Sequence, residues 1–182
     1  MIKSTRIFSI AKLRNSTNII DSFIYSKEQK LIILTSIGRL FKFDLSNKYL
    51  NPSTKQSLGM LLVNLLPTEQ IVSCCKSKDK DILYLVSKKG KFFKLKIDEI
   101  YDSFTSKLGY VNEKICLKDD QFIKVLTSEQ YIDVETNKNK SARLNLNKLE
   151  LNSSKNILKI NFLNLEKDEY LENCYRLENY TI

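Results

Sequence analysis

The basic residues are the side chains of this sequence best suited to bind a ligand. Lysine and arginine number 30 against 21 acidic residues, which gives the 182-residue chain a net charge of +9. Such an excess favours a polyanionic partner, either nucleic acid or an acidic membrane face. Lys88, Lys89 and Lys91 cluster around Gly90, where the backbone can approach a phosphate closely. Because lysine is abundant along the whole chain, we expect a share of it to be solvated surface without a partner.

Side chains for catalysis are missing. The sequence contains no histidine, so it offers no imidazole base and no Ser/His or Cys/His nucleophile pair. It has no Walker-type phosphate loop and no C-x-x-C pair for zinc. The acidic pairs Asp79/Asp81 and Asp119/Asp120 fall in expected turns, where solvated carboxylates are the ordinary interpretation. We therefore expect no enzyme activity from this chain alone, and no cofactor or metal.

An internal repeat with a period near 50 organises the chain. Gly38 and Gly90 are 52 residues apart, and Gly59 and Gly109 are 50 apart. Around them, the apolar stretch 31–43 matches 83–95 without a gap. This period is in the range of β-propeller blades. The remaining alternative is a generic antiparallel β protein whose copies match through low complexity.

The repeated segments have the pattern of half-buried strands and hairpin turns. Phe41 and Phe43 alternate with polar residues, as do their counterparts in 91–97, and this period of two indicates strands. Gly38 and Gly90 supply the positive φ that such turns need. A weaker third copy follows, with a strand near 131–134 and Asn137 and Asn139 in place of glycine at its turn. Locally, 96–104 has helical spacing and predicts a short turn.

The repeat divides the chain without a linker. The expected units are an N-terminal extension or extra strand (1–18), blade 1 (19–70), blade 2 (71–121), a degenerate blade 3 (122–170) and a tail (171–182).

Three stretches carry a resemblance to a known family. The segment 34–42, LTSIGRLFK, resembles the recurring apolar-Thr-x-x-Gly-x-x-aromatic-basic core of the blades in the C-terminal, DNA-wrapping domain of DNA gyrase and topoisomerase IV A subunits. The segment 57–72, with Gly59, an N-L-L run and E-x-I-V, resembles the connection between blades in that family. The segment 94–100 resembles its strand ending. The likeness covers residues 19–135 well and 136–165 poorly.

The resemblance implies an all-β fold of propeller-like, four-stranded blades, called a β-pinwheel. About three blades are present, which is too few to close a ring of the family's size and implies an open arc or partial ring. The family binds and bends duplex DNA around a basic outer rim, so sequence-independent contacts to phosphates are expected. The candidate DNA-binding residues are Arg39, Lys42, Lys55, Lys88, Lys89, Lys91, Lys94, Lys96 and Lys107.

A departure from the family in the segment 54–59 leaves alternatives open, as does the small number of blades. The segment 54–59 keeps Gln56 and Gly59 of the gyrase glutamine-arginine-glycine box but has no arginine, which favours a topoisomerase IV-like or degenerate role. Type II topoisomerases cleave DNA with a tyrosine that follows an arginine, and this sequence has no such Arg-Tyr pair. Tyr175-Arg176 has the reverse order, so we expect it to have a surface role. The first hypothesis is a non-catalytic duplex DNA-binding module of a type II topoisomerase. The alternative is a propeller-like scaffold that binds protein and has lost DNA affinity.

The same hypothesis sets the expected partners and place of action. Duplex DNA is the main partner, and the cleavage-domain and ATPase subunits of an ATP-hydrolysing topoisomerase are the candidate protein partners. No membrane contact is expected, self-association stays open, and the expected location is the cytoplasm, at the nucleoid, or its organellar equivalent.

Overall fold

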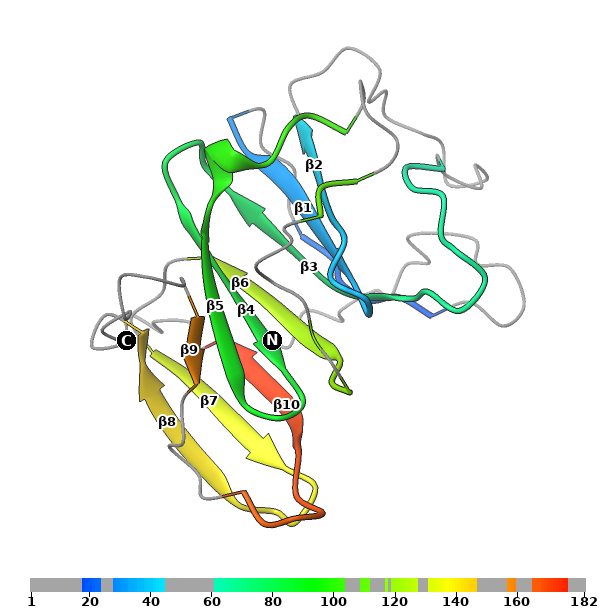
Figure 1. Cartoon of the computed structure of the whole chain (residues 1–182). Coiled ribbons are helices and arrows are strands. Elements are labelled where there is room, and N and C mark those ends of the chain that lie inside the picture. Colours follow the sequence, from blue (N-terminus) through cyan, green and yellow to red (C-terminus); the bar gives the residue numbers. More distant parts are fainter. Residues whose placement is uncertain are drawn as a thin grey trace, which may run out of the picture.

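The computed structural model describes residues 18–23, 28–44, 61–103, 109–111, 117, 119–127, 131–146, 157–159 and 165–176. Within this part of the chain the structure is almost entirely β (Figure 1). Its elements are β1 (Lys30–Thr35), β2 (Leu40–Asp44), β3 (Ile71–Ser77), β4 (Ile82–Ser87), β5 (Lys91–Lys96), the short 3-10 helix η1 (Ile97–Glu99), β6 (Phe122–Thr127), β7 (Tyr131–Thr136), β8 (Ser141–Asn145), β9 (Ile157–Lys159) and β10 (Leu171–Arg176). The short turn expected within 96–104 is confirmed as η1.

The described strands form three antiparallel sheets that follow one another across the molecule (Figure 1). The first sheet has the order β2-β1-β3, the second β6-β4-β5-β9, and the third β10-β7-β8. In each sheet the central strand pairs with the second strand of its own hairpin and with a strand that comes later in the sequence. The predicted propeller-like fold is therefore confirmed as an arc of blades.

The sheets repeat down to single positions. A register shift lies between Leu34 and Thr35 in the first sheet and between Val86 and Ser87 in the second, and a shift at Leu171 marks the third. Beyond each shift, Thr35 pairs with Ile71, Ser87 with Phe122 and Thr136 with Leu171. The spacing of these pairs matches the period of the sequence repeat, so the copies are equivalent in the fold.

Strand exchange between neighbouring repeats joins the blades. The third strand of the first sheet, β3, comes from the next repeat, and β6 and β10 play the same part in the other two sheets. β9 extends the second sheet beyond β5, and an isolated bridge between Leu40 and Tyr110 stands at the same edge of the first sheet. The predicted division at 70, 121 and 170 follows the sequence repeat, whereas each sheet crosses it. The residues 171–176 of the predicted tail form β10 and complete the third sheet. Residues 1–17 of the expected N-terminal extension lie outside the described residues.

Apolar side chains fill the spaces between the sheets. The first layer joins Ile32, Leu34 and Leu40 of the first sheet to Leu85 and Phe93 of the second. A second layer joins the opposite face of the second sheet, with Tyr84, Val86 and Phe92, to the third sheet. Burying one such side chain contributes about 1.5–3 kcal/mol, so these two layers hold the arc together. The outer face of the first sheet carries a third cluster around Phe41 and Phe43.

Gly38 is needed for space as well as for backbone geometry. Its φ is 88°, and a Cβ at this position would stand 2.6 Å from the Phe122 ring. Gly90 and Asn139 occupy the equivalent turn positions with φ of 70° and 57°, which confirms both the predicted glycine turns and the predicted left-handed asparagine. The first turn therefore needs a glycine because it packs against the next sheet.

Replacing Gly38 with asparagine separates the need for space from the need for a positive φ, because Asn139 adopts a positive φ at the equivalent position of the third turn. We expect Gly38→Asn to lower the free energy of unfolding by about 1–3 kcal/mol through the clash with Phe122. Phe122→Leu, which installs the residue found at Leu171, should recover part of this loss in the double variant. Chemical denaturation of the unmodified protein, the two single variants and the double variant measures the coupling energy between positions 38 and 122. Strictly additive effects would contradict the close approach of Gly38 to the Phe122 ring.

Candidate nucleic-acid interface

Three hairpin turns and the loops beside them build the surface that carries the central lysine cluster. We call this surface the turn rim. Its members are the β1–β2, β4–β5 and β7–β8 turns (35–40, 87–91 and 136–140) and the loop residues 65–70, 119–121 and 165–170.

Each turn is closed by the same backbone and hydroxyl hydrogen bonds. The amide of the left-handed residue donates to the carbonyl three positions earlier, at 3.0 Å in all three turns. The hydroxyls of Thr35, Ser87 and Thr136 accept from the amide four positions later, at 3.1, 3.1 and 3.3 Å. Small hydroxyl residues suit this position because their oxygen replaces a missing backbone partner.

Each loop is tied to its turn by one backbone hydrogen bond. The amides of Ser36, Lys88 and Asn137 donate to the carbonyls of Gln70, Gln121 and Tyr170, at 2.8, 2.8 and 3.1 Å. The residue next to that carbonyl, Ile71, Phe122 or Leu171, begins the third strand of the sheet. The turn rim is therefore a fixed continuation of the sheets.

A buried acid meets a basic side chain at every turn. Arg39 Nε lies 3.0 Å from Glu69 Oε1, Lys91 Nζ lies 3.8 Å from Asp120 Oδ2, and Lys140 Nζ lies 2.9 Å from Glu169 Oε2. All three acidic side chains are completely buried. A buried carboxylate is costly unless it is paired and hydrogen-bonded. Arg39 and Lys91, two of the predicted DNA contacts, thus have a structural role as partners of buried acids.

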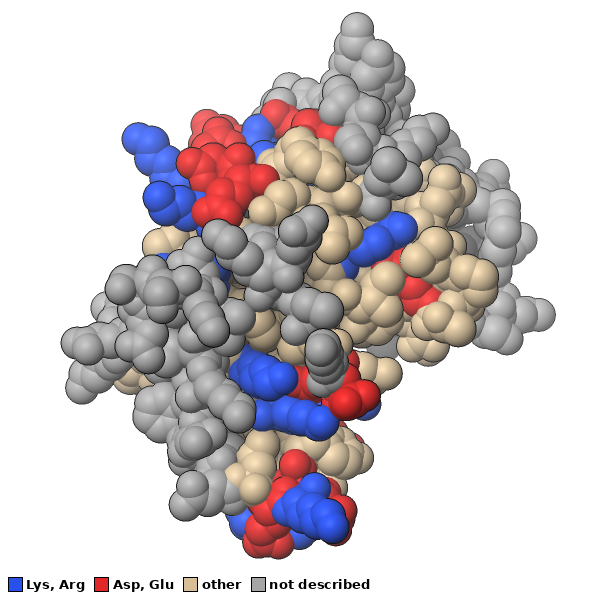
Figure 2. All heavy atoms as spheres, viewed as in Figure 1, with Lys and Arg blue, Asp and Glu red and all other residues tan. Residues whose placement is uncertain are grey.

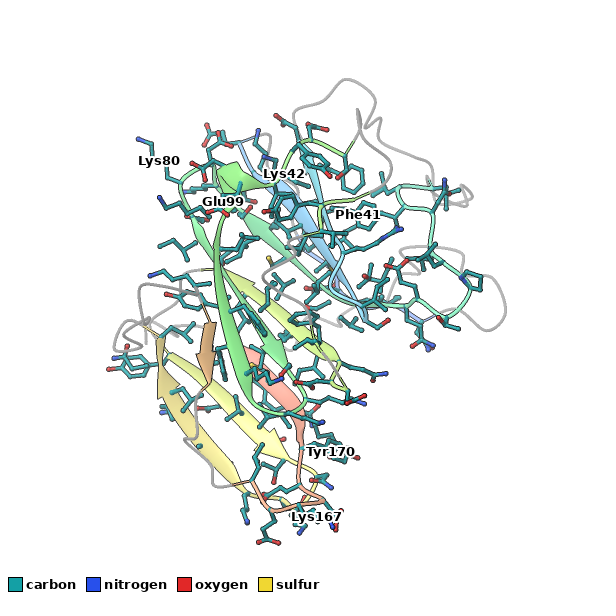
Figure 3. The ribbon with its side chains drawn as sticks, viewed as in Figure 1. Phe41, Lys42, Lys80, Glu99, Lys167 and Tyr170 are labelled. Atoms are coloured by element: carbon teal, nitrogen blue, oxygen red, sulfur yellow. The ribbon has the colours of Figure 1, made fainter. Side chains whose placement is uncertain are left out.

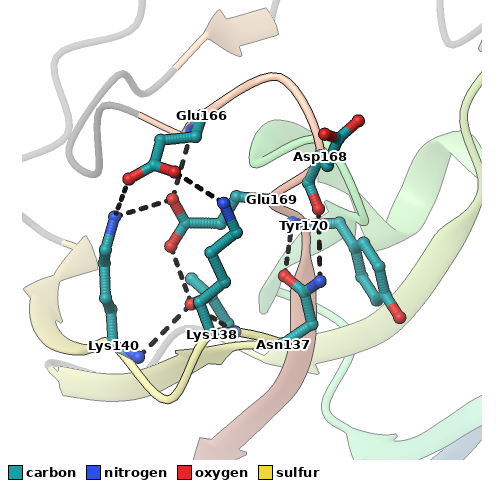
Figure 4. Close-up of polar contacts among 8 residues, drawn as sticks. Asn137, Lys138, Lys140, Glu166, Asp168, Glu169 and Tyr170 are labelled. Atoms are coloured by element: carbon teal, nitrogen blue, oxygen red, sulfur yellow. Dashed lines mark hydrogen bonds and ion pairs between the residues drawn. The ribbon is translucent and has the colours of Figure 1, made fainter.

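The third turn has the densest set of such contacts (Figure 4). Glu169 accepts hydrogen bonds from Lys140, from the Thr136 hydroxyl at 2.8 Å and from the Glu166 amide at 3.1 Å. These bonds, the Lys140 bond first, lower the pKa of the Glu169 carboxyl to about 2. The pKa of Glu166 is also lowered, because Lys138 and Lys140 both donate to it.

The structure gathers some of the predicted DNA contacts and separates others. Lys88, Lys89 and Lys91 lie together at the second turn. Lys42 is half-buried, and its Nζ donates to the Ile97 carbonyl at 3.3 Å. Figure 3 shows Lys42 near Glu99, at the end of the molecule away from Tyr170.

The remaining predicted contacts lie along β5 or outside the described part. Lys94 is half-buried in the middle of β5, and Lys96 is exposed at the end of that strand away from the turn. Lys55 and Lys107 lie outside the described residues. As DNA contacts, all nine residues stay predictions.

The backbone of the second turn is already hydrogen-bonded. The Lys89 amide donates to Asp120 Oδ1 at 3.1 Å, and the Gly90 amide donates to the Ser87 carbonyl at 3.0 Å. Because the Lys88 amide donates to the Gln121 carbonyl, the backbone amides of Lys88, Lys89 and Gly90 all have hydrogen-bond acceptors within the protein. A phosphate at this turn would therefore meet lysine ammonium groups, and the close backbone approach expected at Gly90 has no free donor in these amides.

A hollow of about 550 Å³ opens beside this turn. Its walls are Lys88, Lys89, Asp119, Asp120, Gln121 and Tyr170. We call it the inter-sheet hollow, because Tyr170 precedes a strand of the third sheet and the other residues belong to the second. Lys88 Nζ lies 5.7 Å from the centroid of the Tyr170 ring, a cation–π distance.

Sequence reasoning missed the buried acids and Tyr170. Asp120 was expected to be a solvated loop carboxylate, but its side chain is completely buried. The missed signal is the acid two positions before each third strand, at Glu69, Asp120 and Glu169, which recurs with the period of the repeat. Tyr170 has no counterpart in the other two loops, where glutamine occupies the position.

Charges of both signs alternate on the described surface. On the face in Figure 2, lysine and arginine side chains lie beside aspartate and glutamate in several places, without merging into a continuous basic band. Basic and acidic residues are nearly equal in number in the described part of the chain. Most of the excess of +9 therefore lies in the other segments, including residues 1–17, which contain four basic residues and no acid.

The described residues also bear on metal ligation, on membrane-spanning helices and on the side chains of Tyr175 and Cys174. They contain no group of three or more potential metal-ligating side chains and no helix long and apolar enough to cross a membrane. Tyr175 is exposed on β10. Burial raises the pKa of the Cys174 thiol to about 12, and this buried cysteine is not in a disulfide.

Comparison with known proteins identifies the fold. No protein-family model matches the sequence, and no curated protein does. Among solved structures, the C-terminal domain of DNA topoisomerase IV is similar with a TM-score of 0.63 and 15% identity, over 76% of this chain and 44% of that chain. The E. coli ParC C-terminal domain has a TM-score of 0.55 and 12% identity, over 81% of this chain and 56% of that chain. The DNA gyrase A C-terminal domain has a TM-score of 0.51 and 18% identity, over 68% of this chain and 40% of that chain.

These likenesses show a partial β-pinwheel, the fold of the C-terminal domains of DNA topoisomerase IV and gyrase A subunits. The predicted resemblance and fold class are confirmed. This chain spans about half the length, or less, of the solved chains that it matches.

The Glu169 contacts predict an acid-sensitive contribution to stability. Because the folded pKa is about 2 against an ordinary value of 4.5, the contribution is present above about pH 4.5 and is lost as the pH falls towards 2. Glu169→Gln should therefore flatten the decline of the unfolding temperature across this range, as measured by circular dichroism. Glu172→Gln, a change at an exposed carboxylate nearby, should leave the decline unchanged, and equal profiles for both variants would contradict the prediction.

Proposed function

We propose that this chain is a non-catalytic module that binds duplex DNA without sequence preference, as part of a type II topoisomerase A subunit. The observation that carries the proposal is the fold, which matches the C-terminal domains of DNA topoisomerase IV and DNA gyrase A. The net charge of +9 supports it, because neutralising phosphates is the main source of sequence-independent affinity.

The charge distribution refines how such binding would work. The turn rim supplies a fixed platform, but much of its positive charge is paired with buried acids. We therefore assign the DNA contacts to the unpaired lysines of the rim together with the basic segments outside the described residues. This replaces a uniformly basic rim with a few contact points on a nearly neutral body.

The same proposal names the assembly. The catalytic steps would belong to cleavage-domain and ATPase subunits of an ATP-hydrolysing topoisomerase, and this chain would position DNA for them. Its place of action would be where the DNA lies, in the cytoplasm at the nucleoid or in an organellar equivalent. Self-association stays an open expectation.

The test is a salt series of binding measurements. Fluorescence anisotropy with a labelled duplex should show binding at low salt, and log K should fall linearly with log salt between about 50 and 200 mM. A second duplex of unrelated sequence should bind equally well. No binding at the lowest salt would end the proposal.

One observation favours the alternative, a scaffold that binds protein. Ile37, Leu61, Leu65 and Leu66 are 42–83% exposed around the first turn and its loop. Figure 2 shows mostly uncharged surface over these elements. The second and third turns carry Lys89 and Lys138 where the first has Ile37, and the third loop carries Glu166 where the first has Leu66. An exposed apolar patch of this kind is typical of protein contact sites.

The repeat supplies a matched test of the scaffold. The double variant Ile37→Lys, Leu66→Glu installs residues that the other blades already carry, and it leaves the net charge unchanged. If the patch binds a protein, the variant should lose most of the partner recovered by pull-down while its DNA affinity stays the same. An unchanged pull-down would exclude the patch as the binding surface.

A further inference from the structure

The three turns of the rim differ in their balance of charge. At the first turn, Arg39 is paired with Glu69. At the third, Lys138 and Lys140 are paired with Glu166 and Glu169. Both turns are thereby neutralised by their own loops.

The second turn keeps an excess of positive charge. Lys91 is the partner of Asp120, so Lys88 and Lys89 face Asp119 as the remaining acid of the inter-sheet hollow. The Asp120 side chain has no exposed surface, and its Oδ1 accepts hydrogen bonds from the backbone amides of Lys89 and Gln121 at 3.1 and 2.8 Å. Its Oδ2 lies 3.8 Å from Lys91 Nζ, so Lys91 balances the charge of this carboxylate.

The walls of the inter-sheet hollow are fixed from both sides. The Lys88 amide donates to Gln121 of the second sheet's loop, and the Lys88 carbonyl accepts from the Leu171 amide at 2.8 Å. Two hydrogen bonds hold Tyr170 to Asn137. The backbone amide of Asn137 donates to the Tyr170 carbonyl at 3.1 Å, and the side-chain Oδ1 of Asn137 accepts from the Tyr170 backbone amide at 3.0 Å (Figure 4). Tyr170 as a whole is nevertheless 39% exposed. The backbone on both sides of the hollow is thus held by hydrogen bonds, on the second and on the third sheet.

We infer that the inter-sheet hollow binds one phosphodiester of the duplex backbone, an inference that rests on the proposed function. Lys88 and Lys89 supply the positive charge, and the Tyr170 hydroxyl supplies a third donor. Phosphate oxygens accept hydrogen bonds only, so a site with two ammonium groups and a phenol suits them. One excess charge is too weak to retain a free anion, but it adds to other contacts along a duplex.

The experiment compares two lysines that occupy the same position in two turns. Lys89→Gln and Lys138→Gln each remove one positive charge from a turn tip. We expect Lys89→Gln to weaken duplex binding several-fold at low salt and to reduce the slope of log K against log salt by about 1. Lys138→Gln should change the slope little, because Lys138 is already paired with Glu166. Tyr170→Phe, which keeps the ring, should weaken binding by a smaller factor.

The outcomes separate this inference from the function on which it rests. If the unmodified protein binds DNA and the two lysine variants change the slope equally, the inter-sheet hollow is not the contact point, although the proposed function stands. If the unmodified protein does not bind, the function itself fails. Inorganic phosphate added at constant ionic strength should leave duplex binding unchanged, and competition would instead reveal a site for a free anion. Unfolding temperatures of all variants verify that the fold is retained.

Discussion

A buried carboxylate beside each hairpin turn is the constraint on which the turn rim depends. Glu69, Asp120 and Glu169 have no exposed side-chain surface, so each needs a cation and hydrogen-bond donors from the protein. The turn supplies the cation from the position after its left-handed residue, and the backbone supplies amides. Satisfying the acid therefore fixes the loop against the turn and the third strand against its sheet. The same pairing removes positive charge that would otherwise face a ligand.

Strand exchange explains how so short a chain holds an arc of blades. Each sheet takes its third strand from the following repeat, so the chain crosses between neighbouring sheets rather than finishing one before starting the next. The apolar layers on both faces of the second sheet then lock the sheets against each other. The far face of the third sheet differs, because Asp133, Glu135 and Arg143 line it and Arg143 donates two hydrogen bonds to Asp133.

Net charge proved a poor guide to where charge is available. The sequence places lysine and arginine at every turn, yet the first and third turns neutralise theirs with acids from 30 residues or so away. At the second turn the balance leaves Lys88 and Lys89 in excess. On the described surface, positive charge is therefore available at few points, and most of the net charge of +9 lies in other segments of the chain.

The sequence by itself determined the repeat, the strands and the turns. Alternation around Phe41 and Phe93, the glycines at 38 and 90 and the asparagine at 139 are local signals, because a strand's two faces and a turn's positive φ are set within a few residues. Only the tertiary structure decided which strand completes which sheet, and which lysine is paired with an acid. Those outcomes depend on residues far apart in sequence, such as Lys91 with Asp120 or Lys88 with Tyr170, and no local pattern specifies that they meet. Gly38 shows both levels, since its turn was predictable and its contact with Phe122 was not.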